Sequence, residues 1–271
     1  MKRLLPLLLF LIAAPTALAD TAPREDEGAD RSVGHVYLYN FVRVPGHVLG
    51  ELVRTDREGL TRNLAGLAAV GLAYHYDQEI RDWSQERRTD DSDRVSGYLY
   101  DVGTPRTAGI ALGLGYGYSW FADDPYTRDT MHLAFQSLAV SAVFTTAAKV
   151  GVRRIRPRHS PDDPTATGDS GDQSFFSGHA SGSWAFLTVV AERHAHNRPL
   201  YWGSYGLASA VALSRVHDDG HWMSDIVAGS LVGYAVGQAT VRLSPFKGRD
   251  AAVLPLVSSD SVGLQLHVSL P

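Results

Sequence analysis

Apolar residues recur along most of the chain at the spacing of helices. Between residue 33 and Phe246, runs rich in Ala, Leu, Gly and Val are each long enough for several helical turns. They are Leu60–Tyr76, Thr107–Phe121, Thr130–Val152, Gly178–His194, Leu200–Arg215 and Met223–Val241. Because proline lacks the amide N–H and clashes with the preceding turn, we expect helices to stop at Pro125, Pro157 and Pro199. The pattern predicts an all-α fold, a compact helical bundle.

Three windows within these runs lack charged residues altogether. They are Thr107–Ala122, Pro199–Ser214 and Ile226–Val241. Each is shorter than the run of about 20 apolar residues that crosses a bilayer, and each contains several Gly, Ser or Tyr residues. We interpret them as central helices of a soluble bundle, with membrane insertion as the alternative.

Two segments depart from the helical pattern. Arg158–Ser174 is a polar stretch interrupted by Pro161, Pro164, Gly168 and Gly171, which predicts a long loop between two helices. Loops of this length in a compact domain are often functional. In the tail, apolar residues two apart lie on either side of Ser258-Ser259-Asp260-Ser261. This alternation predicts a short C-terminal β-hairpin.

The first residues have the features of a targeting segment. Lys2 and Arg3 precede the apolar stretch Leu4–Ala14, and Ala17-Leu18-Ala19 has small residues where a signal peptidase cuts. We expect a signal peptide cleaved after Ala19 and export to the periplasm or cell envelope, an uncleaved anchor being the alternative. The predicted organisation is a signal peptide (1–19), a flexible leader (20–32), a helical domain (33–246) and a hairpin tail (247–271).

The amino-acid composition excludes several kinds of site and partner. The 271-residue chain has no cysteine, which excludes disulfides, zinc-thiolate sites, iron-sulfur clusters held by cysteine and cysteine nucleophiles. Its 25 Lys+Arg and 29 Asp+Glu give a formal net charge of −4. Nucleic-acid-binding proteins are usually basic, so no nucleic-acid partner is expected.

Five cations nevertheless lie close together at the end of the predicted helix Thr130–Val152. They are Lys149, Arg153, Arg154, Arg156 and Arg158. If the helix reaches Pro157, residues 149, 153 and 156 share one face. Guanidinium groups beside an ammonium suit a phosphate dianion. The alternative is a solvated basic helix end that complements the helix dipole.

Two further motifs carry imidazole groups. Ser177-Gly178-His179 begins an apolar helical run, where unpaired N–H groups point at an anion. Ser214-Arg215 precedes His221 and Asp225, which are four apart. On a helix beginning near Gly220, Asp225 would accept a hydrogen bond from one imidazole nitrogen and leave the other as a nucleophile or base. Taken singly, these motifs also fit a Ser-capped helix with a surface histidine and an ordinary His-Asp pair.

The order and spacing of all three motifs resemble a known signature. Lys149 with Arg156-Pro157, then Ser177-Gly178-His179, then Ser214-Arg215 with His221 and Asp225 is similar to the tripartite signature of the phosphatidic acid phosphatase type 2 and vanadium haloperoxidase superfamily. The resemblance covers Lys149 to Asp225, and the helical pattern is compatible with that family's bundle. It implies a metal-independent phosphomonoesterase that needs no cofactor.

The resemblance also implies a role for each matched residue. His221 attacks phosphorus to form a phosphohistidine, and Asp225 orients its ring. His179 protonates the leaving group and then activates water. Phosphate-binding residues are Lys149, Arg156, Ser177, Gly178 and Arg215. We assign the other histidines to the surface or core: His35, His47, His75, His132, His159, His194, His196, His217 and His267.

The chain departs from the family pattern at one position. Phe176, preceded by Phe175, stands where the family usually has proline before Ser-Gly-His. Loss of proline puts the loop geometry in doubt more than the catalytic groups. We favour packing of both rings in the core, the alternative being an apolar entrance for a lipid tail. Arg153, Arg154 and Arg158 lie outside the motif positions and are expected to strengthen the field that attracts an anion.

The resulting expectation is an exported bacterial phosphatase. Its substrate is a soluble phosphate ester or a lipid-linked one, such as a phospholipid or an isoprenoid phosphate, and peripheral membrane contact is an open possibility. Two rival functions belong to other classes. One is a vanadate-dependent haloperoxidase; the other is a non-catalytic envelope protein that retains the fold. The sequence does not indicate an oligomeric state.

Overall fold

A computed structural model describes residues 33–169, 171–246, 250–257 and 262–269, the last two segments by their backbone. The α-helices are α2 (Val33–Leu52), α3 (Arg57–His75), α4 (Asp77–Glu86), α5 (Asp90–Val102), α6 (Pro105–Phe121), α7 (Pro125–Val152), α8 (Gly178–Arg193), α9 (Arg198–His217) and α10 (Met223–Arg242), with a 3₁₀ turn at Pro157–His159. Strands β1 (Asp250–Val257) and β2 (Val262–Ser269) follow. The predicted signal peptide and leader lie outside the described residues.

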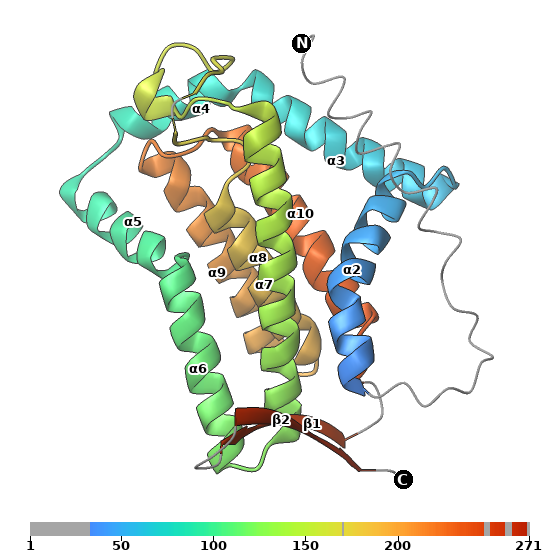
Figure 1. Cartoon of the computed structure of the whole chain (residues 1–271). Coiled ribbons are helices and arrows are strands. Elements are labelled where there is room, and N and C mark those ends of the chain that lie inside the picture. The colour runs from blue at the N-terminus through green and yellow to red at the C-terminus, as the bar shows by residue number, and fades with distance from the viewer. Residues whose placement is uncertain (1–32, 170, 247–249, 258–261, 270–271) are drawn as a thin grey trace.

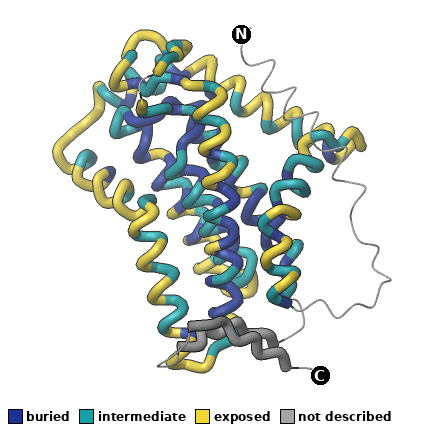
Figure 2. The backbone as a smooth tube through the Cα atoms, in the orientation of Figure 1, coloured by how far each residue is buried: buried dark blue, intermediate teal, exposed yellow. Residues whose placement is uncertain are grey.

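The bundle is built around α7, α8, α9 and α10, with α2 and α6 at its flanks (Figure 1). Buried residues concentrate on α7, α8 and α10 (Figure 2). One core cluster joins three helices: Val44 and Val48 of α2, Val140 of α7, and Val236 and Ala239 of α10. At one end of the bundle lie α4 and the long 158–174 loop; the hairpin lies at the other, with β1 against α7. The all-α prediction is confirmed.

The closest helix contact is between α8 and α10. A Cβ atom on Gly233 would lie 2.3 Å from the Ser181 carbonyl oxygen, and one on Gly229 would lie 2.8 Å from that of Ser177. These glycines, a turn apart, let the two backbones touch. The start of α8 is therefore held against the start of α10, where Ser177 N donates to the Asp225 carbonyl at 3.2 Å. Backbone packing thus joins two of the sequence motifs.

The six helices predicted from periodicity are all present, with ends shifted by a few residues. The expected proline stops take a different form: Pro125 and Pro199 lie in the first turns of α7 and α9, and Pro157 begins the 3₁₀ turn. Proline tolerates these positions because first-turn N–H groups have no helical partner. The helices α2, α4 and α5 were not among the predicted runs. The hairpin is present as predicted, antiparallel, with Asp250 opposite Ser269 and Val257 opposite Val262.

The interpretation of all three uncharged windows as central helices was wrong for α6. α10 lies in the centre of the bundle and α9 buries several residues along one face. In α6, by contrast, Ser119 is the one residue that is buried. Its Leu114 is 71% exposed and its Phe121 is 92% exposed. In α6 the absence of charged residues therefore reflects an exposed apolar surface and not burial in the core. Within the described residues, one helix, α7, is long and apolar enough by length and composition to cross a membrane.

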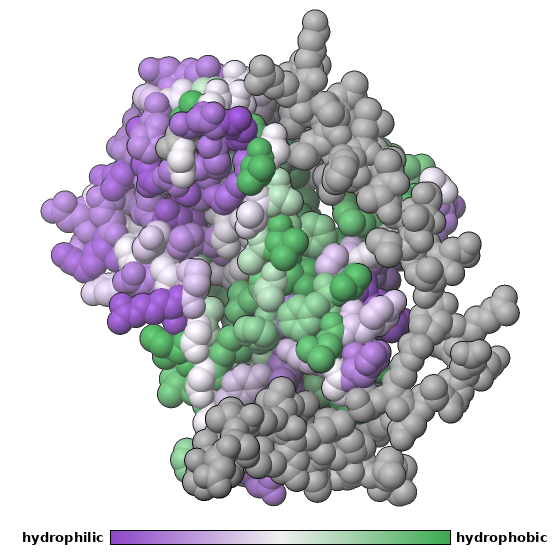
Figure 3. All heavy atoms as spheres, in the orientation of Figure 1, coloured by the Kyte–Doolittle hydropathy of each residue, from purple (hydrophilic) through white to green (hydrophobic). Residues whose placement is uncertain are grey.

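The surface is divided by polarity. Hydrophilic side chains gather at the end that carries α4 and the long loop, and hydrophobic ones lie along the flank below it (Figure 3). Exposed apolar side chains occur on α3, α6, α7, α9 and α10, among them Leu64, Ile110, Val143, Leu213 and Leu231. The polar end is also where the sequence motifs meet.

Candidate active site

The cation cluster at the end of α7 divides into groups that point in different directions. α7 ends at Val152 because Arg153 adopts a left-handed conformation with φ 56° and caps it. The helix therefore does not reach Pro157, which was the condition for residues 149, 153 and 156 to share one face. Arg153 is partly exposed and pairs with Asp169. The chain beyond it runs extended, and Gly168 N donates to the Arg153 carbonyl at 2.9 Å.

Arg154 lies buried behind the site. Its guanidinium group donates to Asp225 Oδ1 at 2.7 Å and to Asp77 Oδ2 at 2.6 Å. Ser224 completes the network, since its hydroxyl donates to Asp77 at 2.6 Å. All three charged side chains are at most 5% exposed. Arg154 was expected to strengthen the field on a substrate; instead its charge is neutralised by two carboxylates, and it holds one of them in place.

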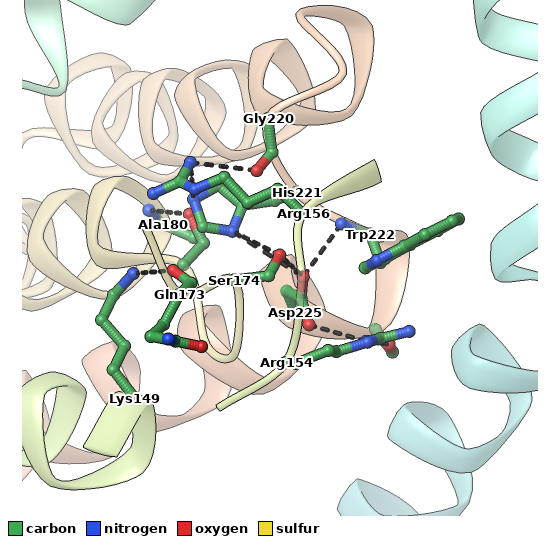
Figure 4. A network of polar contacts seen from close by, with 12 residues as sticks. Lys149, Arg154, Arg156, Gln173, Ser174, Ala180, Gly220, His221, Trp222 and Asp225 are labelled. Atoms are coloured by element: carbon green, nitrogen blue, oxygen red, sulfur yellow. Dashed lines mark hydrogen bonds and ion pairs between the residues drawn. The ribbon is translucent and has the colours of Figure 1, made fainter. Parts of the chain in front are cut away.

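The end of the long loop contacts the site at three successive residues. Asp172 pairs with Arg156, at 2.8 Å between Oδ1 and Nε, and also with Arg158. The carbonyl of Gln173 accepts a hydrogen bond from Lys149 Nζ, and the hydroxyl of Ser174 donates to Asp225 Oδ2 (Figure 4). The prediction that this loop is functional therefore has a structural basis: it orients the cations and Asp225.

His221 is held from both nitrogens. Arg156 Nη1 lies 3.1 Å from Nε2, and Ser174 Oγ lies 3.4 Å from Nδ1 (Figure 4). Because guanidinium can only donate, Nε2 is the acceptor and the proton belongs on Nδ1. Asp225 Oδ2 is 3.7 Å from Nδ1, so the Ser174 hydroxyl links the imidazole to the carboxylate. The arrangement leaves a lone pair on Nε2.

The spacing of His221 and Asp225 has a different cause from the one expected. α10 begins at Met223, so His221 precedes the helix. Asp225 is in its first turn, where Oδ2 accepts from Trp222 N at 3.0 Å in a capping arrangement. His221 N donates to the Arg215 carbonyl at 3.1 Å, which ties the imidazole-bearing turn to the end of α9.

Arg215 and His179 form the other side of the site. Arg215 is buried and pairs with Asp218. His179 is in the first turn of α8, and its Nε2 is buried with no hydrogen-bond partner among the described residues. Ser177 is the N-cap of α8: its hydroxyl oxygen accepts from Ala180 N at 3.3 Å. Phe176 is buried, as favoured from the sequence, whereas Phe175 is partly exposed.

Burial and like charges shift the titration of these groups. Burial lowers the pKa of His221 to about 4, with Arg156 adding to the effect. Burial and the charges of Arg215, His221, Arg156 and Lys149 lower the pKa of His179 to about 3. Burial and then Arg156 lower the pKa of Lys149 to about 8. At neutral pH both imidazoles are therefore neutral beside three cations, which makes this site suited to an anion.

The structure thus brings together every residue that the sequence singled out for the site. His221, Asp225 and Arg215 come from the α9–α10 segment, Ser177 to His179 from α8, and Lys149 and Arg156 from α7 and the chain after it. Sequence reasoning missed four residues that contact the site. They are Asp77, Asp172, Ser174 and Tyr100, whose ring stacks on the His179 imidazole. Among them, only Asp172 and Ser174 offered a signal in the sequence, through their position in a long polar loop.

Comparison with known proteins finds similarity in the part of the chain that contains the site. Residues 131–249 match the model of the PAP2 superfamily. The matched segment is less than half of the chain and is similar to PAP2 superfamily proteins. The match contains all three motifs and excludes α2 to α6, so the PAP2 region covers the site but not the helices that flank it.

Two curated proteins are similar to part of the chain. A lipid A 1-phosphatase of Porphyromonas gingivalis is 30% identical over 114 residues, which cover 42% of this chain and 23% of that protein. A PA-phosphatase related-family protein of Dictyostelium discoideum is 30% identical over 151 residues, covering 47% of this chain and 55% of that protein. The chain thus spans less than two thirds of either relative.

A solved structure shares the PAP2 fold. It is a transmembrane PAP2 type phosphatidylglycerolphosphate phosphatase from Bacillus subtilis, with a TM-score of 0.52 and 16% sequence identity. The match covers 75% of this chain and 95% of that one. At this identity the likeness concerns the fold.

Proposed function

We propose that the protein is a metal-independent phosphatase that hydrolyses phosphomonoesters through a phosphohistidine at His221. The observation that carries the proposal is the setting of His221: its Nε2 lone pair faces Arg156 at 3.1 Å, and Nδ1 is linked through Ser174 to Asp225. A neutral imidazole with a fixed tautomer is the form that attacks phosphorus.

In the first step His221 Nε2 forms a bond to phosphorus as the bond from phosphorus to the ester oxygen breaks. Arg156 Nη1 lies in front of Nε2, so a bound phosphoryl group takes that place and Arg156 turns its N–H groups to the phosphoryl oxygens. Asp225 stabilises the positive charge that develops on the imidazole. Its own pKa is low because hydrogen bonds and the Arg154 charge outweigh its burial.

His179 supplies and recovers the proton. In the free enzyme it is neutral, because burial and neighbouring cations lower its pKa to about 3. A phosphate dianion among those cations reverses part of this effect and favours the imidazolium. His179 then protonates the leaving oxygen. In the second step it takes a proton from the water that attacks phosphorus, and the bond from phosphorus to Nε2 breaks.

The remaining residues hold the phosphoryl oxygens. Lys149, Arg156 and Arg215 provide cations, and Ser177 and Gly178 provide a hydroxyl and an N–H at the start of α8. In phosphoryl transfer, negative charge spreads over the equatorial oxygens, and many enzymes neutralise it with Mg²⁺. Three fixed cations beside the nucleophile meet the same need, and this supports a metal-independent reaction.

For the substrate we propose a lipid phosphate presented at a membrane surface of the cell envelope, after export of the chain. Two observations support it. The names of the relatives refer to lipid A and phosphatidylglycerolphosphate. The polar end with the site adjoins a flank of exposed apolar side chains on α6, α7 and α9 (Figure 3). Exposed apolar surface of this extent is typical of contact with lipid or another protein.

The test is a phosphate-release screen over soluble esters, phosphatidic acid, phosphatidylglycerolphosphate, isoprenoid diphosphates and lipid A. The wild type is expected to act on at least one lipid phosphate in the presence of EDTA. His221→Ala is expected to lose activity by at least about 10³-fold, as removal of a nucleophile does. His196→Ala, at an exposed histidine outside the site, is the matched control. Near-wild-type turnover by His221→Ala would contradict the mechanism, and preference for soluble esters would contradict the lipid substrate.

A further inference from the structure

The junction of α5 and α6 contacts the proposed acid–base histidine directly. The ring of Tyr100, near the end of α5, stacks on the imidazole of His179 with centroids 4.7 Å apart and planes at 28°. The Arg215 guanidinium carbon lies 4.6 Å from the centroid of the same ring. One aromatic side chain therefore contacts both residues, and it comes from a helix outside the PAP2 match.

Gly103, between the two helices, closes a second side of His179. A Cβ atom there would lie 2.9 Å from His179 Cδ2 and 2.5 Å from Val211 Cγ1. Contacts below 3.0 Å require a shift of the neighbours, so the backbone at Gly103 packs directly on the imidazole edge. Tyr100 covers the ring face and Gly103 limits its edge.

These contacts matter because His179 lacks the usual means of orientation. A catalytic histidine is generally fixed by a hydrogen bond at one ring nitrogen. Among the described residues none bonds His179 Nε2, although that atom is buried. Packing against Tyr100 and Gly103 is therefore what fixes the plane of the His179 imidazole.

The junction is itself tied to the helix that carries Arg215. Ser96 of α5 donates through its hydroxyl to the Ser214 carbonyl at 3.1 Å, and Asp93 pairs with His217 at 2.8 Å. Both partners are at the end of α9. These contacts hold Tyr100 in a fixed position relative to Arg215. Because the Tyr100 ring also stacks on His179, they set the distance between His179 and the Arg215 guanidinium group.

We propose that Tyr100, supported by Gly103, is a positioning residue that holds His179 in the plane from which it protonates the leaving group. The inference rests on the proposed function and adds a role for a residue that the family motifs do not contain. A misplaced His179 imidazole slows only those reactions whose leaving group must be protonated. Loss of contact with Arg215 affects every phosphoryl transfer alike.

This difference defines the experiment. kcat/KM is measured for a short-chain phosphatidic acid, whose alkoxide must be protonated, and for dinitrophenyl phosphate, whose phenolate leaves unaided. kcat/KM reports the steps up to departure of the leaving group, so the later hydrolysis does not enter. Tyr100→Leu is expected to lower kcat/KM for phosphatidic acid by about 10²-fold more than for dinitrophenyl phosphate, within the usual range of general-acid catalysis.

Three variants accompany it. Tyr100→Phe keeps the ring and is expected to behave as the wild type. Gly103→Ala is expected to show the same selective loss. Tyr98→Leu, on the same helix with its side chain exposed, is the matched control and is expected to change neither substrate. Because Tyr100 is itself 40% exposed, its replacement leaves the core intact.

Equal losses on both substrates in Tyr100→Leu, or a selective loss in Tyr98→Leu, would overturn the inference while leaving the proposed function standing. A wild type that releases phosphate from neither substrate here nor from any ester of the wider screen, or a His221→Ala variant that retains turnover, would overturn the proposed function and this inference with it.

Discussion

Arg154 and His221 lie on opposite sides of the Asp225 carboxylate. Arg154 Nη1 is 2.7 Å from Oδ1, whereas His221 Nδ1 is 3.7 Å from Oδ2. The arginine thus fixes the acid that the imidazole needs, and Asp77 fixes the arginine at 2.6 Å. Removing one member of such a buried network leaves the other charges uncompensated.

We predict that Arg154→Met is strongly destabilising. Two fully buried carboxylates, Asp77 and Asp225, would lose their shared cation, and breaking a buried pair typically costs about 3–5 kcal/mol. Chemical denaturation measures the loss. Arg153→Met is the control, because the neighbouring Arg153 is 44% exposed and its ion pair is screened by solvent. Equal stability of the two variants would contradict the structural role of Arg154.

A second prediction concerns the contact of α8 with α10. Gly233→Ala places a methyl group 2.3 Å from the Ser181 carbonyl and is expected to destabilise the fold by about 1–3 kcal/mol, the usual cost of overpacking. Gly203→Ala, in α9 with open space at its Cβ, is expected to stabilise by up to about 1 kcal/mol through helix propensity. Thermal unfolding of both variants checks this. The two substitutions are expected to change the stability of the fold in opposite directions. A Gly233→Ala variant as stable as the wild type would contradict the close contact.

The third prediction is an alkaline limit set by Lys149. Burial lowers its pKa from 10.5 to about 8, so the side chain is protonated below that pH and neutral above it. kcat/KM, which reports the free enzyme, is expected to fall as the pH rises through about 8. Lys149→Arg keeps its charge and is expected to move this fall to higher pH, whatever its absolute activity. An unchanged alkaline limb in that variant would assign the titration to another group.

Proton uptake on anion binding is the fourth prediction. His179 is neutral in the free enzyme because its pKa is about 3, and a bound phosphate dianion favours its charged form. Calorimetric titration with sulfate, which is already a dianion near pH 6 and releases no proton on binding, in buffers of different ionisation enthalpy, is expected to show net uptake. The uptake should disappear in His179→Ala. Identical uptake in this variant would show that the proton goes elsewhere.

Periodicity predicted the helices that carry the motifs, but it did not predict their environment. α6 lacks charge as a central helix does, and yet its Leu114 is 71% exposed. Local sequence does not distinguish an apolar interior from an apolar exterior, because both are uncharged. α4 and α5 are short and mostly polar, so a search for long apolar runs does not find them.

The candidate site was predictable from the order and spacing of all three motifs, through their resemblance to a family signature. Lys149, His179 and His221 were found in this way. Asp77 and Tyr100 were not, since their contacts with Arg154 and His179 each join residues more than seventy positions apart. The end of α7 at Val152 also escaped prediction: the left-handed conformation of Arg153 has no local sequence signal of the kind that glycine gives.

The central claim is that His221 becomes phosphorylated. His179→Ala, incubated with dinitrophenyl phosphate and quenched in alkali, is expected to accumulate phosphoenzyme, because the leaving group needs no proton whereas hydrolysis of the intermediate needs the missing base. Mass spectrometry of the tryptic peptide Val216–Arg242 is expected to locate the phosphoryl group on His221 rather than His217. Phosphate on His217 or on another residue, or turnover of His179→Ala with no phosphoenzyme at any time, would contradict the account.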